Sequence, residues 1–357
     1  MERFANAQFA AGYLFGLAPP LLLVIGLAAG VPWLAFAVLI GAFPFLRIVF
    51  GDAASAERLL DERTATCLHY LPYFIALSYI ASFVVAIYLL RSQNLNAVAL
   101  VGYGLSQWVV AMFCSCVAHE LLHRRDPGAR VLARILNGLI LYPLLEHEHR
   151  MHHAREGGVL EAEWAAPEES VWTFSARRLR CVLRSAWCFY RAVPGRCWSS
   201  GLTLSIASAA AHVGLLVTAT GSTAVVLAYA LASLAVMWAL QNLTYIQHWG
   251  LGNSVIEGRV ASWEDLCRVQ AWLTLNISLH HSHHVRPSVP YYRLSPTRAA
   301  PRPPAGYVVL FFCAMFPRAW FRLMTPVLDA WLDDPRNRVS VGRRLVCFRR
   351  AESTKLR

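Results

Sequence analysis

The chain has 357 residues, of which 57% are hydrophobic and only 15% are charged, a balance that excludes an ordinary water-soluble globular protein. The formal net charge of +12 would suit a nucleic-acid binder, but the charges avoid three long stretches. Residues 9–46 and 197–251 contain no charged side chain and residues 64–118 contain only Arg91, so the composition favours a membrane protein with no nucleic-acid partner.

Each of these three stretches is long enough for two membrane-spanning helices, since one crossing of the hydrocarbon takes about 20 residues. The sequence therefore predicts an all-α integral membrane protein with six transmembrane helices, at residues 9–29, 31–50, 71–90, 97–118, 201–218 and 223–243. Pro19 and Pro20 predict a kink in the first span. The first span is not interpreted as a cleavable signal, because the second follows after only three residues.

The positions of the basic residues predict the orientation of these spans. If both termini are cytoplasmic, Arg91 is the only one of 33 Lys and Arg residues in the outer loops, which are 30–32, 91–96 and 219–222. This asymmetry is a strong positive-inside signal. It predicts a protein of a bacterial-type inner (cytoplasmic) membrane that contacts anionic lipid headgroups.

The remaining segments are assigned to the cytoplasmic side. Residues 119–200 and 244–336 are predicted to form a cytoplasmic head, and residues 1–336 as a whole are predicted to form a single domain. The basic tail, residues 337–357, is predicted to be disordered.

Ten of the 13 histidines fall in three short motifs of the predicted cytoplasmic head. The motifs are HELLH at 119–123, HEHRMHH at 147–153 and HHSHH at 280–284, and His248 follows the sixth span in YIQHWGL. The predicted topology brings all four segments to one membrane face. Their imidazoles are therefore expected to converge.

The spacing within each motif places several rings on one helical face, because residues three or four apart are neighbours on a helix. The HELLH helix is predicted to stop at residues 126–128, and residues 130–153 are predicted to form a second helix. A third helix is predicted to start at Ser262, with Asp265 in a capping box, and to run into HHSHH. Together with His248, these segments supply nine candidate metal ligands: His119, His123, His149, His152, His153, His248, His280, His283 and His284.

Nine imidazoles are too many for one metal, since a catalytic zinc takes three protein ligands. Two metals with four to five nitrogens each would use nearly all of them, but neutral imidazole suits iron, copper, zinc and nickel alike. Carboxylates commonly hydrogen-bond the outer nitrogen of a ligand ring. The candidates for such supporting roles are Glu120, Glu146, His147, Glu148 and His281, although Glu120 with Arg124 is also an ordinary i,i+4 ion pair.

Two other classes of protein could carry part of this pattern. HExxH alone fits an intramembrane zinc hydrolase with one metal and Glu120 as the base. A metal transporter would hold its ions near the bilayer midplane, whereas these motifs lie at one edge of the predicted spans. The chain contains neither a CxxC pair nor a glycine-rich dinucleotide motif after a strand, so it encodes no reductase of its own.

The ordered motifs HELLHRR, HRMHH, YIQHWGL and HHSHHVRPSVPYYRL resemble those of membrane-bound di-iron hydroxylases of the alkane 1-monooxygenase and xylene monooxygenase type, relatives of the membrane fatty acid desaturases. The similarity covers about residues 70–332. It implies an iron-ligating role for eight of the nine histidines. The ninth is assigned to His149, with His147 as the alternative, because HRMHH has the two-residue gap typical of desaturases. Thr244 stands where the hydroxylases usually have Asn.

The resemblance also implies chemistry and partners. It implies two non-haem Fe ions as the catalytic group itself, O2 as co-substrate, and hydroxylation of an unactivated C–H bond in an alkane, an alkyl-aromatic compound or a fatty acyl chain that enters from the bilayer. A fatty acyl desaturase is the alternative. A separate electron carrier, rubredoxin or ferredoxin with an NAD(P)H reductase, is implied as well, and an exposed face including Arg177, Arg178 and Arg180 is predicted to dock it.

Overall fold

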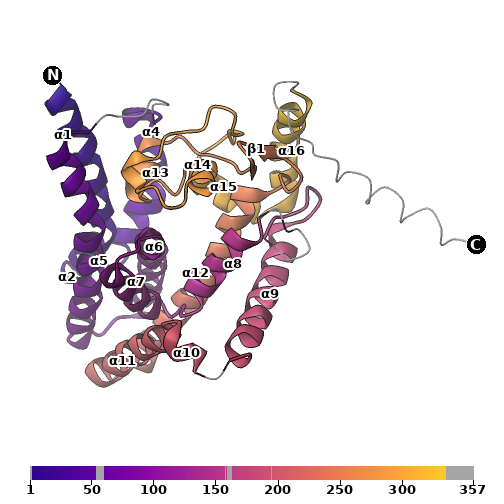
Figure 1. Ribbon diagram of the computed structural model, residues 1–357. Helices are drawn as coiled ribbons and strands as arrows, with labels where there is room; N and C mark the ends of the chain where they lie inside the picture. The colour runs from indigo at the N-terminus through magenta and orange to yellow at the C-terminus, as the bar shows by residue number, and fades with distance from the viewer. Residues whose placement is uncertain (1, 54–59, 157, 159–162, 194, 335–357) are drawn as a thin grey trace, which may run out of the picture.

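The computed structural model describes residues 2–53, 60–156, 158, 163–193 and 195–334, and Figure 1 shows their arrangement. The described part is mostly helical, as predicted, with one two-stranded hairpin, β1 (Val255–Ile256) and β2 (Arg259–Val260). The predicted tail, residues 337–357, lies outside the described residues.

Five helices of the described chain are long and apolar enough to cross a membrane. The first, Asn6–Ala28, combines α1 (Glu2–Gly12), a 3-10 turn η1 (Tyr13–Leu17) and α2 (Ala18–Ala28). The change to 3-10 geometry comes just before Pro19 and Pro20, where the kink was predicted. The other four are α5 (Glu62–Arg91), α6 (Ala97–Leu122), α11 (Leu202–Thr220) and α12 (Thr223–His248).

The second predicted span, residues 31–50, is not one regular helix. It runs through α3 (Leu34–Phe36), a π-helical segment η2 (Ala37–Ala42), a 3-10 turn η3 (Phe43–Phe45) and α4 (Leu46–Phe50). Pro44 explains this irregularity, because proline has no N–H and clashes with the preceding turn of a regular α-helix. A sixth span in this region stays a prediction.

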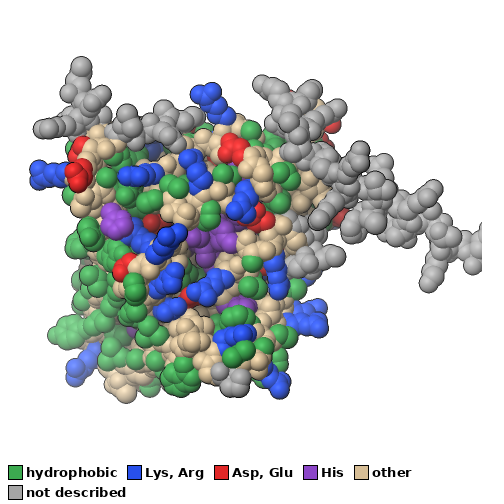
Figure 2. All heavy atoms as spheres, in the orientation of Figure 1, with side chains coloured by type: hydrophobic (Ala, Val, Ile, Leu, Met, Phe, Trp, Pro, Cys, Tyr) green, Lys and Arg blue, Asp and Glu red, His purple; other side chains and the backbone are tan. Residues whose placement is uncertain are grey.

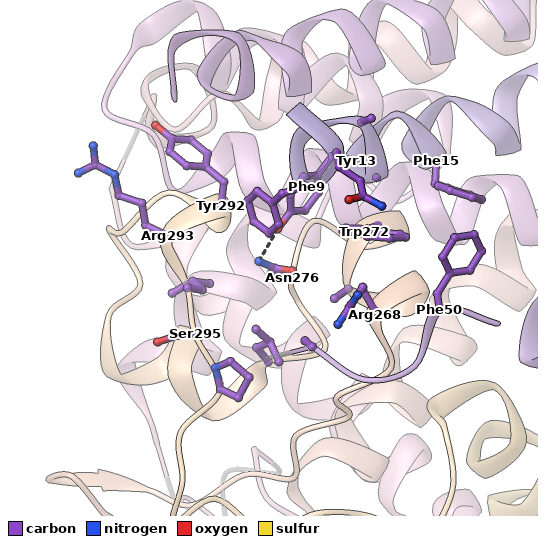
Figure 3. A pocket seen from close by; sticks show the side chains of 18 of the residues that line it. Phe9, Tyr13, Phe15, Phe50, Arg268, Trp272, Asn276, Tyr292, Arg293 and Ser295 are labelled. Carbon is purple, nitrogen blue, oxygen red and sulfur yellow. Dashed lines mark hydrogen bonds between the residues drawn. The ribbon is translucent and has the colours of Figure 1, made fainter. Parts of the chain in front are cut away.

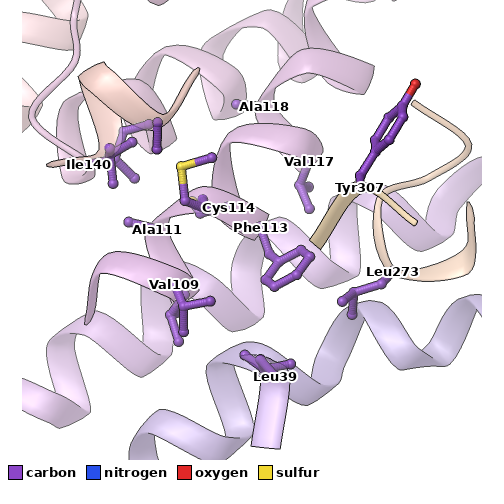
Figure 4. Packing of buried hydrophobic residues seen from close by; sticks show 14 of the residues in the cluster. Leu39, Val109, Ala111, Phe113, Cys114, Val117, Ala118, Ile140, Leu273 and Tyr307 are labelled. Atoms are coloured by element: carbon purple, nitrogen blue, oxygen red, sulfur yellow. The ribbon is translucent and has the colours of Figure 1, made fainter. Parts of the chain in front are cut away.

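Helix α6 is the centre of the bundle. It packs against α12, α7 (Pro127–Leu139) and α3, and nearly every side chain from Ser106 to Leu121 is buried. Figure 4 shows its Val109, Phe113 and Val117 side chains with Leu39, Leu273 and Tyr307 around them. This packing fixes the carboxyl end of α6, which carries HELLH.

Two of the predicted cytoplasmic helices are divided in the structure. The single helix predicted for residues 130–153 is wrong, because α7 ends at Leu139 and α8 (Leu145–Ala154) begins after a turn in which Leu141 has φ +53°. Pro143 causes this break, since the residue before a proline disfavours the α conformation. Because of this break, α8 is a separate helix that does not continue α7.

The helix predicted from Ser262 to residue 284 is also wrong. Residues 261–266 are irregular, α13 spans Arg268–Leu273, and α14 spans His280–Val285 after two residues with positive φ, Leu275 and Asn276. Asp265 does not cap a helix that starts at Ser262. Its carboxylate instead accepts hydrogen bonds from the backbone N–H groups of Cys267 and Tyr307, each at 3.0 Å.

The remaining elements complete the head. They are α9 (Val171–Arg191), α10 (Arg196–Ser199), the 3-10 turn η4 (Tyr291–Arg293), α15 (Tyr307–Ala314) and α16 (Pro317–Asp333). In Figure 1, α13, α14 and β1 lie at the same end of the molecule as the N-terminus, close to the end of α12. The four histidine segments meet at this end.

Candidate metal centre

All nine candidate ligands come together, in two neighbouring groups whose potential ligand atoms lie within 4.8 Å of one another in each group. The five-histidine group contains His119, His123, His149, His153 and His283. The four-histidine group contains His152, His248, His280 and His284. The rings come from α6 and its C-cap, from α8, from the last residue of α12, and from α14.

The four-histidine group has the geometry of a metal site. Its Nε2 atoms form a closed ring with edges of 3.1 Å from His152 to His284, 3.1 Å from His284 to His280, 2.9 Å from His280 to His248 and 3.1 Å from His248 to His152. A square with an edge of about 3 Å has its centre about 2.1 Å from each corner, which is the length of a metal–imidazole bond. Four nitrogens aimed at one such point fit a metal ion.

The five-histidine group converges in the same way. The Nε2 atoms of His149 and His123 are 2.7 Å apart, and those of His283 and His153 are 3.1 Å apart. Burial lowers the pKa of His123 to about 4. Burial, followed by the neighbouring histidines, lowers the pKa of His153 to about 2. These imidazoles are therefore neutral at physiological pH, which is the protonation state that binds a metal.

A buried network of charged side chains, which the sequence analysis missed, contacts the His152 nitrogen that points away from the four-histidine group. This nitrogen, Nδ1, lies 3.0 Å from a Glu163 carboxylate oxygen, and the same carboxylate accepts a hydrogen bond from Arg178. Arg178, which is 2% exposed, also donates to Glu148 at 3.1 Å, and Glu148 accepts the hydroxyl of Tyr142. Burial opposes ionisation of Glu163, but Arg178 and His152 outweigh it and lower its pKa to about 2. A carboxylate in this position fixes the orientation of the ring.

A signal for Arg178 was present in the sequence. The buried side of α9 carries Val171, Phe174, Val182 and Ala186, and Arg178 occupies the same stripe at helical spacing. An arginine on an apolar stripe needs a buried acidic partner. The prediction that Arg178 belongs to an exposed docking face is wrong for this reason, whereas Arg180 is exposed.

Two further residues support the four-histidine group without having been predicted. Glu156 lies 3.3 Å from Nδ1 of His284 and is itself paired with Arg259 at 3.2 Å. Trp164, which is fully buried, stacks on His152 with ring centroids 5.4 Å apart. Together they shield one side of the group from water.

The predicted supporting residues take other positions. Glu146 pairs with Arg134 at 2.8 Å and with Arg150 at 2.9 Å, and the Glu120 carboxylate lies 3.2 Å from Arg124. In the described part of the chain, neither carboxylate forms a hydrogen bond or an ion pair with a ligand histidine.

The other three candidates also lie outside the two groups. Glu148 reaches His152 only through Arg178 and Glu163. His147 turns away towards the Ser185 hydroxyl at 2.9 Å, and His281 is fully buried against the β1–β2 hairpin. His149, and not His147, therefore completes the five-histidine group.

A cavity of about 100 Å³ lies directly against the two groups. His119, His149, His152 and His280 line it, and the rest of its wall is mixed. Leucine and isoleucine side chains alternate there with polar groups that include Glu148, Arg178 and Gln247. A second, apolar cavity of about 80 Å³ shares Cys116 and Leu243 with the first and continues between α6, α12 and α15. The two cavities adjoin at Cys116 and Leu243, and together they are called the path below.

The profile of the family described as "Fatty acid desaturase" matches residues 92–314, which is more than half of the chain and includes all nine histidines. The chain belongs to the fatty acid desaturase family. This membership confirms the resemblance drawn from the histidine motifs.

Relatives of this chain within the family are membrane monooxygenases. Alkane 1-monooxygenase of Pseudomonas putida is 25% identical over 330 residues, which cover 86% of this chain and 81% of the relative. Alkane 1-monooxygenase 1 of Alcanivorax borkumensis is 24% identical, covering 84% of this chain and 78% of the relative. The xylene/toluene monooxygenase hydroxylase component of Pseudomonas putida is 24% identical over 63% of each chain.

These findings agree with the geometry. The five apolar helices and the membrane monooxygenase relatives make this family member a multi-pass membrane protein. Its two histidine groups make it a metalloprotein of the oxidoreductase class.

Proposed function

We propose that the protein is a membrane-bound non-haem di-iron monooxygenase, which uses O2 to hydroxylate an unactivated C–H bond in a lipophilic substrate. The observation that carries this proposal is the pair of histidine groups beside the path, in a chain similar to alkane 1-monooxygenases over most of its length. One zinc with an HExxH base would leave the other histidine group unexplained.

The residues that would hold the two irons are the two histidine groups themselves. Nine neutral nitrogen ligands suit a soft or borderline metal such as ferrous iron, and four or five per ion leave room for a further ligand. Bound there, a pair of irons would supply the redox chemistry that activates dioxygen. The chain's own contribution is to orient the rings, as Glu163 does for His152 and Glu156 for His284.

The substrate would lie in the path with its reactive carbon beneath the histidines. The second cavity is apolar, and Leu240, Leu243 and Ile277 continue its apolar surface towards the histidines, which favours a hydrocarbon chain or an alkyl-aromatic compound; Thr244 and Gln247 add polar groups beside them. An apolar lining also excludes water from the reacting carbon. Desaturation of a fatty acyl chain is the second candidate, because the family profile and the two-residue gap of HRMHH point to desaturases.

We further propose that the histidine end is cytoplasmic in a bacterial-type inner membrane and that rubredoxin or ferredoxin, with an NAD(P)H reductase, delivers electrons there. Figure 2 shows histidine side chains at the centre of one face with basic side chains around them. Arg150, Arg155 and Arg286 are exposed on or next to the helices that carry the ligands. An acidic carrier would be steered to such a face.

The proposal treats residues 1–336 as one functional domain. The ligands come from α6, α8, α12 and α14, so both metal groups depend on helices spread over residues 97–285.

The test is metal analysis of the purified protein, followed by turnover with ¹⁸O2. We expect two irons per chain and a labelled alcohol from an n-alkane when rubredoxin and its reductase are supplied. An unlabelled alkene would assign the protein to desaturation, because only hydroxylation transfers the label. One zinc per chain, with activity indifferent to substitution of His280 and His284, would refute the di-iron proposal and support the hydrolase.

A further inference from the structure

A cavity of about 520 Å³ lies apart from the metal centre, between the N-terminal helices, α4 and α13. It shares no lining residue with the cavities beside the histidines. The segment that separates it from the metal site is short, since Asn276 and Leu279 face this cavity while Ile277 and His280 line the other. A cavity of this size is large enough for a small organic ligand.

Six aromatic side chains line the cavity, as Figure 3 shows: Phe9, Tyr13, Phe15, Phe50, Trp272 and Tyr292. The ring of Trp272 lies 5.5 Å from Phe50 and 5.8 Å from Phe15, and Phe9 lies 5.3 Å from Tyr13. Trp272 packs directly on the backbone of Gly12, where a Cβ atom would come within 2.1 Å of the indole. Such a wall buries an apolar chain at little entropic cost.

Two arginines line the same cavity. The Arg268 guanidinium is anchored by a hydrogen bond of 2.8 Å to the backbone oxygen of Asp52, whose carboxylate is paired with Arg47 at 2.9 Å. Arg293 is exposed and lies over the Tyr292 ring. No carboxylate lines the cavity in the part of the chain that the structure describes, and neither arginine has an ion-pair partner there.

The cavity lies at the edge of the membrane-spanning bundle. One lining residue, Val49, is 72% exposed, and its neighbours Phe45 and Ile48 are exposed as well. Side chains of this kind face lipid in a membrane protein, so one side of the cavity is next to hydrocarbon. Arg268 lies close to that side, because its guanidinium donates to the backbone oxygen of Asp52. Apolar walls with a cationic group beside them match one ligand chemistry.

We propose that this cavity binds an anionic amphiphile, with its acyl chain among Phe9, Phe50 and Trp272 and its carboxylate or phosphate at Arg268, whereas Arg293 points away from the cavity on the opposite side (Figure 3). Guanidinium groups recognise these oxyanions through paired hydrogen bonds. The ligand is either a free fatty acid or an anionic phospholipid, which share this chemistry. The site is independent of the metal centre and of the substrate path.

The test is native mass spectrometry of the full-length metal-loaded protein with three probes: oleate, dioleoyl phosphatidylglycerol and dioleoyl phosphatidylcholine. We expect one saturable binding event for oleate or phosphatidylglycerol, and the probe that binds identifies the source. The variant Arg268→Gln should weaken that event by roughly tenfold or more, since a lost charged hydrogen bond is worth about 1.5–3 kcal/mol. The control Arg180→Gln removes an exposed arginine of α9 and should leave it unchanged.

Retention of bound metal reports that each variant is folded, because neither Arg268 nor Arg180 belongs to the histidine groups. A photoreactive oleate analogue should label peptides that contain Phe9, Phe50 or Trp272 in the wild type. Equal binding of phosphatidylcholine, equal weakening by Arg180→Gln, or labelling confined to other peptides would each overturn the proposal. None of these results depends on the protein's catalytic activity, so failure here leaves the monooxygenase proposal intact.

Discussion

Replacing Glu163 by Gln isolates the role of the buried charges behind the four-histidine group. The substitution keeps the size of the side chain but removes the negative charge that lies between His152 and Arg178. Breaking a buried ion pair costs about 3–5 kcal/mol when the other charge is left alone. Arg178 retains Glu148 at 3.1 Å, so we expect a loss of about 3 kcal/mol in the free energy of unfolding.

The metal affinity of this group should fall as well. Loss of a carboxylate that orients a ligand histidine typically costs 10–100-fold in affinity. The assay is iron content against increasing chelator at fixed protein, and we expect Glu163→Gln to release one iron at about 10–100-fold lower chelator than the wild type while the second iron is retained. Glu146→Gln is the matched control, because Glu146 also lies between two arginines but contacts neither histidine group.

Two results would refute this reasoning. If Glu163→Gln loses both irons together, the carboxylate supports the whole head and not one group. If Glu146→Gln lowers iron retention equally, general destabilisation accounts for the effect.

Three further predictions follow from single contacts. His149→Ala should reduce iron to about one per chain whereas His147→Ala should keep both, and equal loss in the two variants would contradict the assignment of the ninth ligand. Cys116→Phe places a larger side chain where the two cavities adjoin, so turnover of long alkanes should fall by about tenfold or more relative to short alkanes in competition assays. An equal loss of turnover for alkanes of all lengths would show that the substrate does not lie in these cavities. Gly250→Ala should lower the free energy of unfolding by about 1–3 kcal/mol in thermal melts, because Gly250 has φ +76° and a Cβ would lie 2.4 Å from Leu328; an unchanged melting temperature would show that this turn relaxes freely.

The sequence correctly predicted those helices whose pattern of residues depends on one helix alone. The uncharged runs predicted α5, α6, α11 and α12 because lipid exposure demands apolar side chains along an entire helix. HELLH placed His119 and His123 on one face because α6 continues unbroken to Leu122.

The predictions failed where a local break or a distant partner decides the structure. Pro143 divided the predicted helix 130–153. The Asp265 carboxylate, which was predicted to cap a helix, instead accepts a hydrogen bond from the backbone N–H of Tyr307, 42 residues away. Glu163 and Arg178 were missed because their partnership exists only after α9 packs beside α8. Helical spacing could have indicated that Arg178 is buried, but it could not have shown which carboxylate Arg178 contacts.

The same two short helices serve both metal groups. Helix α8 gives His149 and His153 to one group and His152 to the other, and α14 gives His283 to one and His280 and His284 to the other. The rotation of about 100° per residue along each helix thus sets how far apart the two histidine groups lie, and it would set the spacing of two ions held there. Inserting a single residue between His149 and His152 would turn His152 and His153 away from their partners at the same time. Substitutions in the lining of the two cavities could therefore change the substrate without changing the spacing of the two histidine groups.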